Sequence, residues 1–460
     1  MESGVILLFL AMVVWTQFRR ASDPEYDVNA SLAPVRWLPF LFVFMAVIFS
    51  RMLRDKSPLL GIEIAAGLAL SLMHPVNALC FMAHLTILRP WEIEVGNSLL
   101  NLLPRLTVVT CLLSYLIHPK QRPSLNPRKI RSVLFLIAFS GWLLLTIAKV
   151  PGRATALLGW FDGYFKPLIA FAMALFFIES EISVREFELT LVVSSLSLMA
   201  NGLYQFLAGE TLQGRLVFGK SYNKLGDPND MGAMIVMAIP FILVPVFRRK
   251  TNLLAKAAAS IYAAWAAIVV WLTQSRGTML AIVAQFLLSR VIRDKKLRFR
   301  VIITACLLGV GYVGLIRLVP RDSDEMEASQ NSRLTFWKSA VNMAVHNPIL
   351  GVGFNQYPER YMSYVVGTVV ERGNRTAHSS WFLALGESGF IGFFFFLAFF
   401  VSVARVAWRN RAKRPAQMYA LVGYGVAMSF LSHTYSPFYY LLMGLLVASN
   451  NVKERVTGGP

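Results

Sequence analysis

Cysteine is scarce in this chain, and its cysteines do not occur in pairs. The three are Cys80, Cys111 and Cys306, each within an apolar stretch, and no Cys-x-x-Cys spacing occurs. A disulfide framework or a structural zinc site requires closely spaced cysteines or a cysteine–histidine set. The sequence therefore gives no support to either, and we expect the cysteines to be packing residues.

Charge is also scarce, acidic charge above all. Only 15% of the 460 residues are charged, with 25 Asp or Glu against 45 Lys or Arg, whereas 56% are hydrophobic. The mean hydropathy is +0.55. This composition excludes a soluble domain of such length and indicates a polytopic membrane protein.

The net charge of +20 would suit a nucleic-acid-binding protein, but its distribution argues against that class. Basic residues form short clusters between apolar runs, as in the cytoplasmic loops of membrane proteins. No tandem repeat, low-complexity tract or soluble-domain linker is visible, so we expect one integral-membrane domain over residues 1–460. The first residues, MESGVILLFLAMVVWTQF, lack a basic n-region and a small-residue cleavage site, which favours a retained first span.

Apolar runs long enough to cross a bilayer recur along the chain. We therefore expect an all-α polytopic membrane protein with about 12–14 transmembrane helices. The run at 77–88 is interpreted as a re-entrant or interfacial piece, because a further full span would break the charge pattern of the loops. The expected spans are 3–18, 37–50, 58–73, 97–117, 131–149, 158–178, 188–207, 231–247, 255–273, 277–292, 299–318, 381–404, 416–432 and 436–448.

The basic clusters predict the orientation of these spans. With the spans above, the clusters fall on one side, which should be the cytoplasm together with both termini. The clusters lie within 51–56, 120–131, 248–256, 290–300 and 405–414. The intervals left on the outer face are 208–230, a tight turn at 274–277, the long loop 319–380 and a short link at 432–436. Within the long loop, NSRLTFWKSAVNMAVHNP has apolar residues at helical spacing and should form a surface helix that stops at Pro348.

Two arginines fall on this outer face. Arg215 lies in GETLQGRLVFGKSYNKLGDPNDMG, where Lys220 and Lys224 add cations and Asn229 lies in the turn that opens the next span. Such a loop could hold an anionic oxygen at a helix N-terminus, or anchor to lipid headgroups. Arg276 lies in the tight turn WLTQSRGTMLA. A guanidinium at the end of two spans should meet an anionic ligand or form a structural ion pair.

His378 lies at the mouth of the apolar run that begins at Trp381. Imidazole is the side chain best suited to take a proton from a hydroxyl at neutral pH, although an interfacial histidine is often only a tolerated polar residue. If the two arginines bind a phosphate or pyrophosphate leaving group, a base opposite them completes a glycosyl or acyl transfer site. His433, in the outer link, is a weaker candidate.

Polar residues also occur within the spans. Asp162 and Lys166 are four residues apart and can form an ion pair on one helical face. They either neutralise one another or line a polar cavity. The second possibility would suit a transporter or flippase, but we see no internal repeat of the kind common in transporters.

The stretches RLTFWKSAVNMAVHNPILGVGFNQY and TAHSSWFLALGESGFIG resemble the signature region of the bacterial O-antigen ligase and O-antigen polymerase superfamily. GRLVFG, GDPNDMGAM and LTQSRGTML add to the resemblance. The ligase pattern is a histidine, then Asn, Ser or Gln, nine residues, a glycine, two residues, and Gly, Thr or Tyr. His378, Ser379, Gly389 and Gly392 satisfy it, with serine in place of the commoner asparagine.

The resemblance implies a GT-C-like membrane glycosyltransferase that needs no metal ion or ATP. Its donor would be an undecaprenyl-pyrophosphate-linked glycan, and its acceptor a lipid A-core sugar on the periplasmic face of the inner membrane. By motif, Arg215 and Arg276 would hold the pyrophosphate and His378 would be the general base. Supporting candidates are Arg333, Lys166, Lys220 and Asn229. The superfamily also contains polymerases and protein O-oligosaccharyltransferases, so both alternatives stay open.

The orientation can be tested with reporter fusions. Fusions placed near Gly219 and Val366 should report an extracytoplasmic location, because both positions lie on the side opposite the basic clusters. Activity of a periplasm-specific reporter at each position is the measurement. A cytoplasmic result at either position would contradict the predicted topology.

Overall fold

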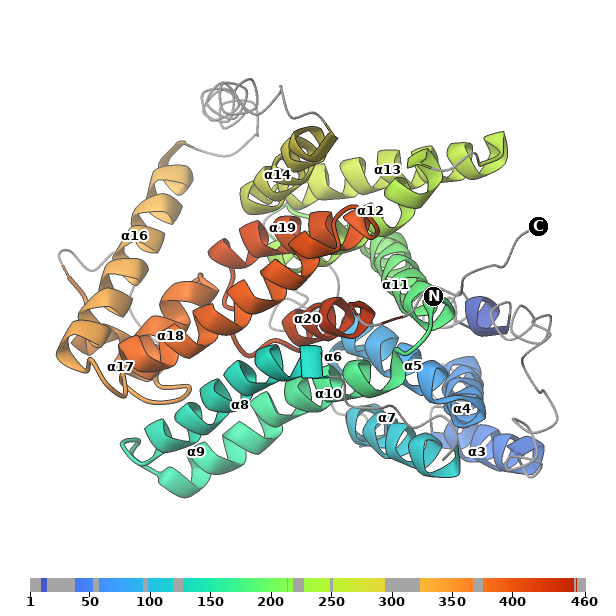
Figure 1. Cartoon of the computed structure of the whole chain (residues 1–460), viewed down its shortest axis with the longest axis horizontal. Coiled ribbons are helices and arrows are strands. Elements are labelled where there is room, and N and C mark those ends of the chain that lie inside the picture. Colours follow the sequence, from blue (N-terminus) through green and yellow to red (C-terminus); the bar gives the residue numbers. More distant parts are fainter. Residues whose placement is uncertain are drawn as a thin grey trace. The chain divides into compact units, whose positions relative to one another are not determined.

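The computed structural model describes residues 10–14, 38–52, 58–93, 98–118, 127–212, 214–217, 227–248, 251–293, 323–366, 375–450 and 452. Over these residues the chain is built from helices, and it contains no strand beyond one isolated bridge between Leu212 and Arg215 (Figure 1). The expected span 299–318, and the expected span 3–18 apart from residues 10–14, lie outside the described residues. The chain divides into two compact units, one formed by Met1–Leu125, Ile169–Thr273 and Leu441–Pro460, the other by Asn126–Leu168 and Gln274–Tyr440.

The first unit is organised around a mostly apolar helix, α5 (Pro75–Leu88). Nearly every α5 side chain is buried, and the helix packs against α4 (Pro58–Met73), α7 (Ser98–Ile117) and α11 (Glu181–Leu207). Burial of this kind disfavours an interfacial position for 77–88, since an interfacial helix keeps one face exposed to water, whereas the re-entrant alternative stays a prediction. The remaining helices of this unit are α3 (Leu38–Met52), α6 (Pro90–Ile93), most of α10 (Lys166–Phe177), α12 (Pro228–Arg248), α13 (Leu253–Thr273) and the end of α20 (Pro437–Ser449).

The second unit is organised around the longest helix, α18 (Ser380–Arg409). It packs against α8 (Pro127–Ile147) on one side and α16 (Ser323–His346) on another. The predicted helix in the long loop is thus confirmed, and it ends two residues before Pro348. The other elements are α9 (Arg153–Gly159), η3 (Trp160–Phe165), α14 (Arg276–Arg293), α17 (Tyr357–Arg360), η6 (Tyr361–Ser363), α19 (Pro415–Ala427), η7 (Met428–Phe430) and the start of α20.

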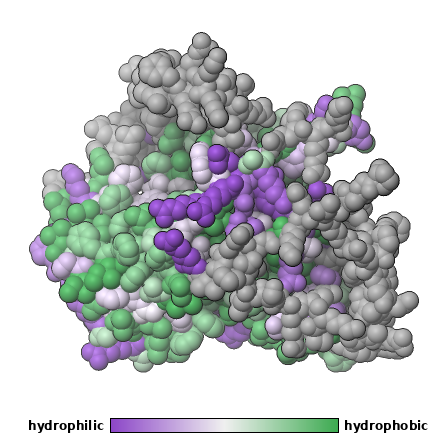
Figure 2. Space-filling view, viewed as in Figure 1, coloured by the Kyte–Doolittle hydropathy of each residue, from purple (hydrophilic) through white to green (hydrophobic). Residues whose placement is uncertain are grey.

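Many helices are long and apolar enough to cross a membrane. Among the described residues six qualify: Leu100–Ile117, Arg153–Phe177, Glu181–Leu207, Pro228–Val246, Leu253–Thr273 and Ser380–Arg409. Large hydrophobic side chains also cover much of the visible surface (Figure 2), and Leu145, Leu158 and Phe394 are each more than half exposed. The all-α polytopic membrane class is therefore confirmed. The total of about 12–14 spans stays a prediction, because α19 and α20 have 13 residues each and extend only about 20 Å.

α18 contains a break in its backbone at Gly389. This glycine has φ 67° and ψ −171°, values that essentially only glycine adopts. The loop that follows α16 takes over the hydrogen bonds lost there: Phe390 N–H donates to the Pro348 carbonyl at 2.8 Å, Val352 N–H to Gly386 at 2.9 Å, and Gly353 N–H to Glu387 at 3.0 Å. The loop is thereby fixed against the broken helix.

Replacing Gly389 by Ala should destabilise the protein. A Cβ at this position would lie 2.5 Å from the Ile349 carbonyl oxygen, in addition to the backbone strain, so we expect a loss of about 1–3 kcal/mol or more. The unfolding midpoint in detergent is the measurement. Gly141→Ala is the control, because a Cβ there meets nothing within 4 Å in a helix, and it should be neutral or stabilising. Equal midpoints for the two variants would contradict the analysis.

Candidate functional site

Arg215 lies in the first unit, in a turn held against the C-terminal end of α13. The turn closes through a bridge between Leu212 and Arg215, and Leu216 N–H donates to the Leu272 carbonyl at 3.0 Å. The guanidinium is 7% exposed, and its Nε donates to the Thr273 carbonyl at 2.9 Å. A cation is favourable here, because the last carbonyls of a helix carry partial negative charge.

Asn229, a predicted supporting residue, contacts Arg215 directly. Its amide nitrogen and its backbone N–H both donate to Asp227 Oδ1, at 2.7 and 2.8 Å. This leaves Asn229 Oδ1 to accept a hydrogen bond from Arg215 Nη2 at 3.4 Å. The start of α12 therefore contributes to the setting of Arg215, whereas Lys220 and Lys224 lie outside the described residues.

Arg276 lies in the second unit, as the first residue of α14. The tight turn predicted at 274–277 is confirmed: α13 ends at Thr273, Gln274 has φ 50°, and the Ser275 hydroxyl caps the new helix through Thr278. The Arg276 side chain is half-buried, and it is placed at the positive end of α14. An anion bound there would interact with both the Arg276 guanidinium and the N-terminus of α14.

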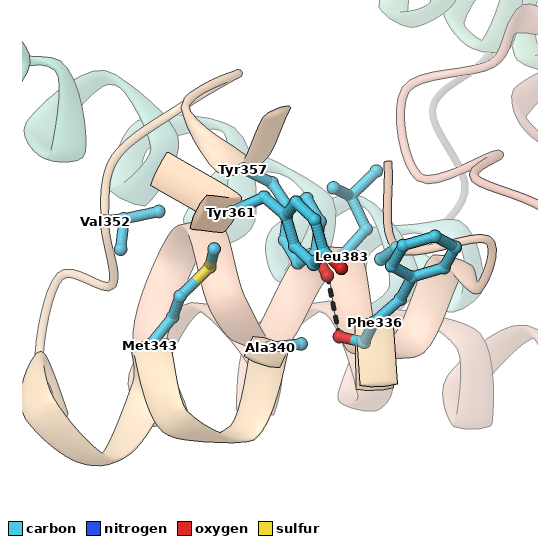
Figure 3. Close-up of a cluster of buried hydrophobic side chains, with 8 residues drawn as sticks. Phe336, Ala340, Met343, Val352, Tyr357, Tyr361 and Leu383 are labelled. Atoms are coloured by element: carbon cyan, nitrogen blue, oxygen red, sulfur yellow. Dashed lines mark hydrogen bonds between the residues drawn. The ribbon is translucent and has the colours of Figure 1, made fainter. Parts of the chain in front are cut away.

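His378 lies just before α18, with a backbone that a bulky residue seldom adopts. Its φ is 45°, in the left-handed region, which costs free energy and persists only where the surroundings enforce it. The preceding Ala377 is fully buried in the cluster of Figure 3, while the imidazole is half-buried and lies 5.6 Å from the Phe336 ring of α16. Burial of Ala377 on one side and of Ser379 on the other therefore fixes where the imidazole emerges.

The outer link 431–436 is bonded to the start of α18. Ser380 Oγ donates to the Leu431 carbonyl at 2.7 Å and accepts from His433 N–H at 2.9 Å. Thr434 Oγ1 donates to the Ser380 carbonyl at 2.8 Å. The weaker candidate His433 is buried, with its Nδ1 2.7 Å from the Tyr424 hydroxyl, so its ring belongs to the core.

Arg333 and the start of α14 lie against the same aromatic ring. The Arg333 guanidinium carbon is 5.8 Å from the centre of Phe430, and the Gly277 backbone packs against the other atoms of that ring. Phe430 also lies 6.3 Å from Trp337, which neighbours Phe336 in sequence. Phe336 and Trp337, consecutive residues of α16, thus lie beside His378 and Phe430 respectively, and Phe430 lies near the start of α14.

Lys166 is paired within its own helix. Its Nζ donates to Asp162 at 3.0 Å across the π-helical turn η3, and both side chains are substantially exposed, 42% and 70%. The ion pair agrees with the prediction that Asp162 and Lys166 neutralise one another. Because both side chains are exposed, they do not line an enclosed polar cavity. Within the part of the chain that the structure describes, no three histidine, cysteine or acidic residues group as metal ligands.

Sequence reasoning missed Glu387. This residue is 1% exposed, and its carboxylate accepts from Tyr357 N–H at 2.9 Å and from the Tyr435 hydroxyl at 2.7 Å. Burial, and then the Glu387 carboxylate, raise the pKa of Tyr435 well above its ordinary value, so its phenol keeps the proton that it donates. An acidic residue inside the run WFLALGESGFIG was the available signal.

Two adjacent serines should respond oppositely to removal of their hydroxyls. Ser380→Ala leaves a buried carbonyl and a buried N–H without partners and should cost about 1–3 kcal/mol. Ser379→Ala should be neutral or stabilising, because the Ser379 hydroxyl is buried and makes no hydrogen bond with the described residues. Unfolding midpoints in detergent test both. A larger loss for Ser379→Ala would contradict this assignment.

Comparison with known proteins adds a family to this geometry. Residues 261–397 match the family model described as O-antigen ligase, from within α13 to within α18. The matched region contains Arg276, Arg333, His378 and the glycines of the α18 break. A search of curated proteins found none that matches the chain. Over the matched region, the chain is similar to the O-antigen ligase family.

Proposed function

We propose that the protein is a ligase-type glycosyltransferase, which moves a glycan from undecaprenyl pyrophosphate to an acceptor hydroxyl of the lipid A-core type. The reaction takes place on the periplasmic face of the bacterial inner membrane. The setting of His378 carries this proposal: an imidazole with a strained backbone lies at the mouth of a 30-residue apolar helix, within the O-antigen ligase match.

His378 is the general base of the proposed reaction. One imidazole nitrogen takes the proton of the acceptor hydroxyl while that oxygen attacks the anomeric carbon of the donor sugar. The bond from the anomeric carbon to the pyrophosphate oxygen breaks, and its electron pair leaves with the diphosphate. A single displacement inverts the anomeric carbon, unlike the double displacement of retaining glycosidases.

Arg276 and Arg215 hold the pyrophosphate and stabilise the charge that develops as it leaves. Arg276 adds the positive end of α14 to its guanidinium. Two hydrogen bonds fix the orientation of Arg215, one from Nε to the Thr273 carbonyl and one from Nη2 to Asn229.

The supporting residues have different settings. Asn229 orients Arg215, and Arg333 adds positive charge beside Phe430 and the start of α14. Lys166 is paired with Asp162, so we assign it a supporting role through that ion pair rather than direct contact with substrate. Lys220 is assigned by sequence alone, as a second cation in the loop of Arg215.

The experiment is reconstitution of the full chain with a polyprenyl-pyrophosphate glycan and a lipid A-core acceptor. His378→Ala should fold normally and lose about a hundredfold or more in transfer rate, because the base is removed. Arg276→Lys should also lower the rate, since a point charge does not replace a planar bidentate guanidinium. Product mass and linkage are the measurements.

His346→Ala is the matched control. This histidine is exposed at the end of α16, where its Nδ1 lies 2.9 Å from the Asn342 carbonyl of the same helix, so the rate should not change. Full transfer by His378→Ala would end the proposal. Transfer only to a second glycan chain, or only to a protein, would replace ligation by the polymerase or the protein O-oligosaccharyltransferase alternative. Movement of the glycan lipid without any transfer would favour a flippase.

A further inference from the structure

Glu387 joins three segments that are far apart in the sequence. Its carboxylate accepts hydrogen bonds from Tyr357 N–H, Asn355 N–H and the Tyr435 hydroxyl. These donors come from the loop after α16 and from the outer link, while Glu387 itself belongs to α18. One buried side chain thus fixes both segments to the helix.

Two chains of contacts lead from this carboxylate to His378. In the first, Glu387 holds the Tyr357 backbone, and the Tyr357 hydroxyl donates to the Phe336 carbonyl at 2.6 Å (Figure 3). The Phe336 ring in turn lies 5.6 Å from the imidazole of His378. In the second, Glu387 holds Tyr435, and the two residues before Tyr435 bond to Ser380. Ser380 is two residues after His378.

A carboxylate satisfies every hydrogen-bond donor at this position. All three partners are donors, and an ionised carboxylate has only acceptors. If a glutamine replaced Glu387, the Tyr435 hydroxyl could accept a hydrogen bond from the glutamine amide. The backbone N–H groups can only donate, so they would still need the glutamine oxygen as their acceptor. Among the described residues no lysine or arginine forms an ion pair with Glu387. A buried carboxylate without a cation is costly, so stability alone does not account for it.

We propose that Glu387 is a positioning residue, which holds the His378 imidazole in place through Tyr357 and Phe336 on one side and through Tyr435 and Ser380 on the other. The catalytic meaning of this role rests on the proposed function, in which His378 is the base. The positional claim itself does not, because it concerns only where the ring is held.

The test measures the position of His378 and the activity separately. The full-length protein is treated with diethylpyrocarbonate at fixed pH, and carbethoxylation of His378 is followed by peptide mass spectrometry. Glu387→Ala and Tyr435→Phe should each raise the modification rate severalfold, and Glu387→Gln should stay near the parent protein. In transfer assays, Glu387→Ala should lower kcat by about a hundredfold with little change in the donor KM.

Controls separate this role from a purely structural one. Glu359→Ala, in the same polar segment but exposed, should change neither measurement. The double variant Glu387→Ala with Tyr435→Phe should be no worse than Glu387→Ala alone, because both changes break the same contact. If Glu387→Ala fails to fold, Tyr435→Phe carries the test, with Glu387→Gln as its control.

The outcomes for the two proposals differ. A fall in kcat with unchanged modification of His378 in Tyr435→Phe would overturn the positioning role. Faster modification of His378 in both Glu387→Ala and Tyr435→Phe would support it, even if His378→Ala kept full transfer activity. That last result would overturn the proposed function alone.

Discussion

The structure of the second unit depends on the break in α18 at Gly389, where the helix lacks some of its own backbone hydrogen bonds. Within a membrane-spanning segment no water is available to replace them, and an unsatisfied carbonyl or N–H there costs several kcal/mol. The carbonyls of Gly386 and Glu387, and the N–H of Phe390, therefore require partners from protein. Residues 348–353 supply them, and this requirement fixes the loop against the helix.

Once the loop is fixed, the aromatic residues around it have defined positions. Tyr357 is set by the Glu387 carboxylate, and its hydroxyl in turn reaches α16 at Phe336. The Phe336 ring packs on His378, whose backbone is left-handed. Strain at one residue persists only when its neighbours are held, so the hydrogen bonds at the break and the unusual backbone of His378 are parts of one arrangement.

Some of this arrangement could be predicted from the sequence, and some could not. The membrane class follows from hydropathy, the end of α16 from Asn347-Pro348, and the turn before Arg276 from the length of chain between two apolar runs. The break in α18 could not be predicted, because residues 381–404 form one continuous apolar run and hydropathy does not detect a change of backbone φ. Glu387 was overlooked because its partners, Tyr357 and Tyr435, are 30 and 48 residues away in the sequence.

The spacing of the sequence motif has a physical meaning in this structure. Between Ser379 and Gly389 lie nine residues of helix, about 14 Å at 1.5 Å per residue, which set the distance from the imidazole to the break. Gly389 is required by its backbone, and Gly392 by close packing, since a Cβ there would lie 2.7 Å from the Trp142 ring of α8. An insertion of one residue between His378 and Gly389 would rotate the imidazole by about 100° relative to the fixed loop. The motif thus specifies a helical segment of defined length, held at the break by the loop and ending at the histidine.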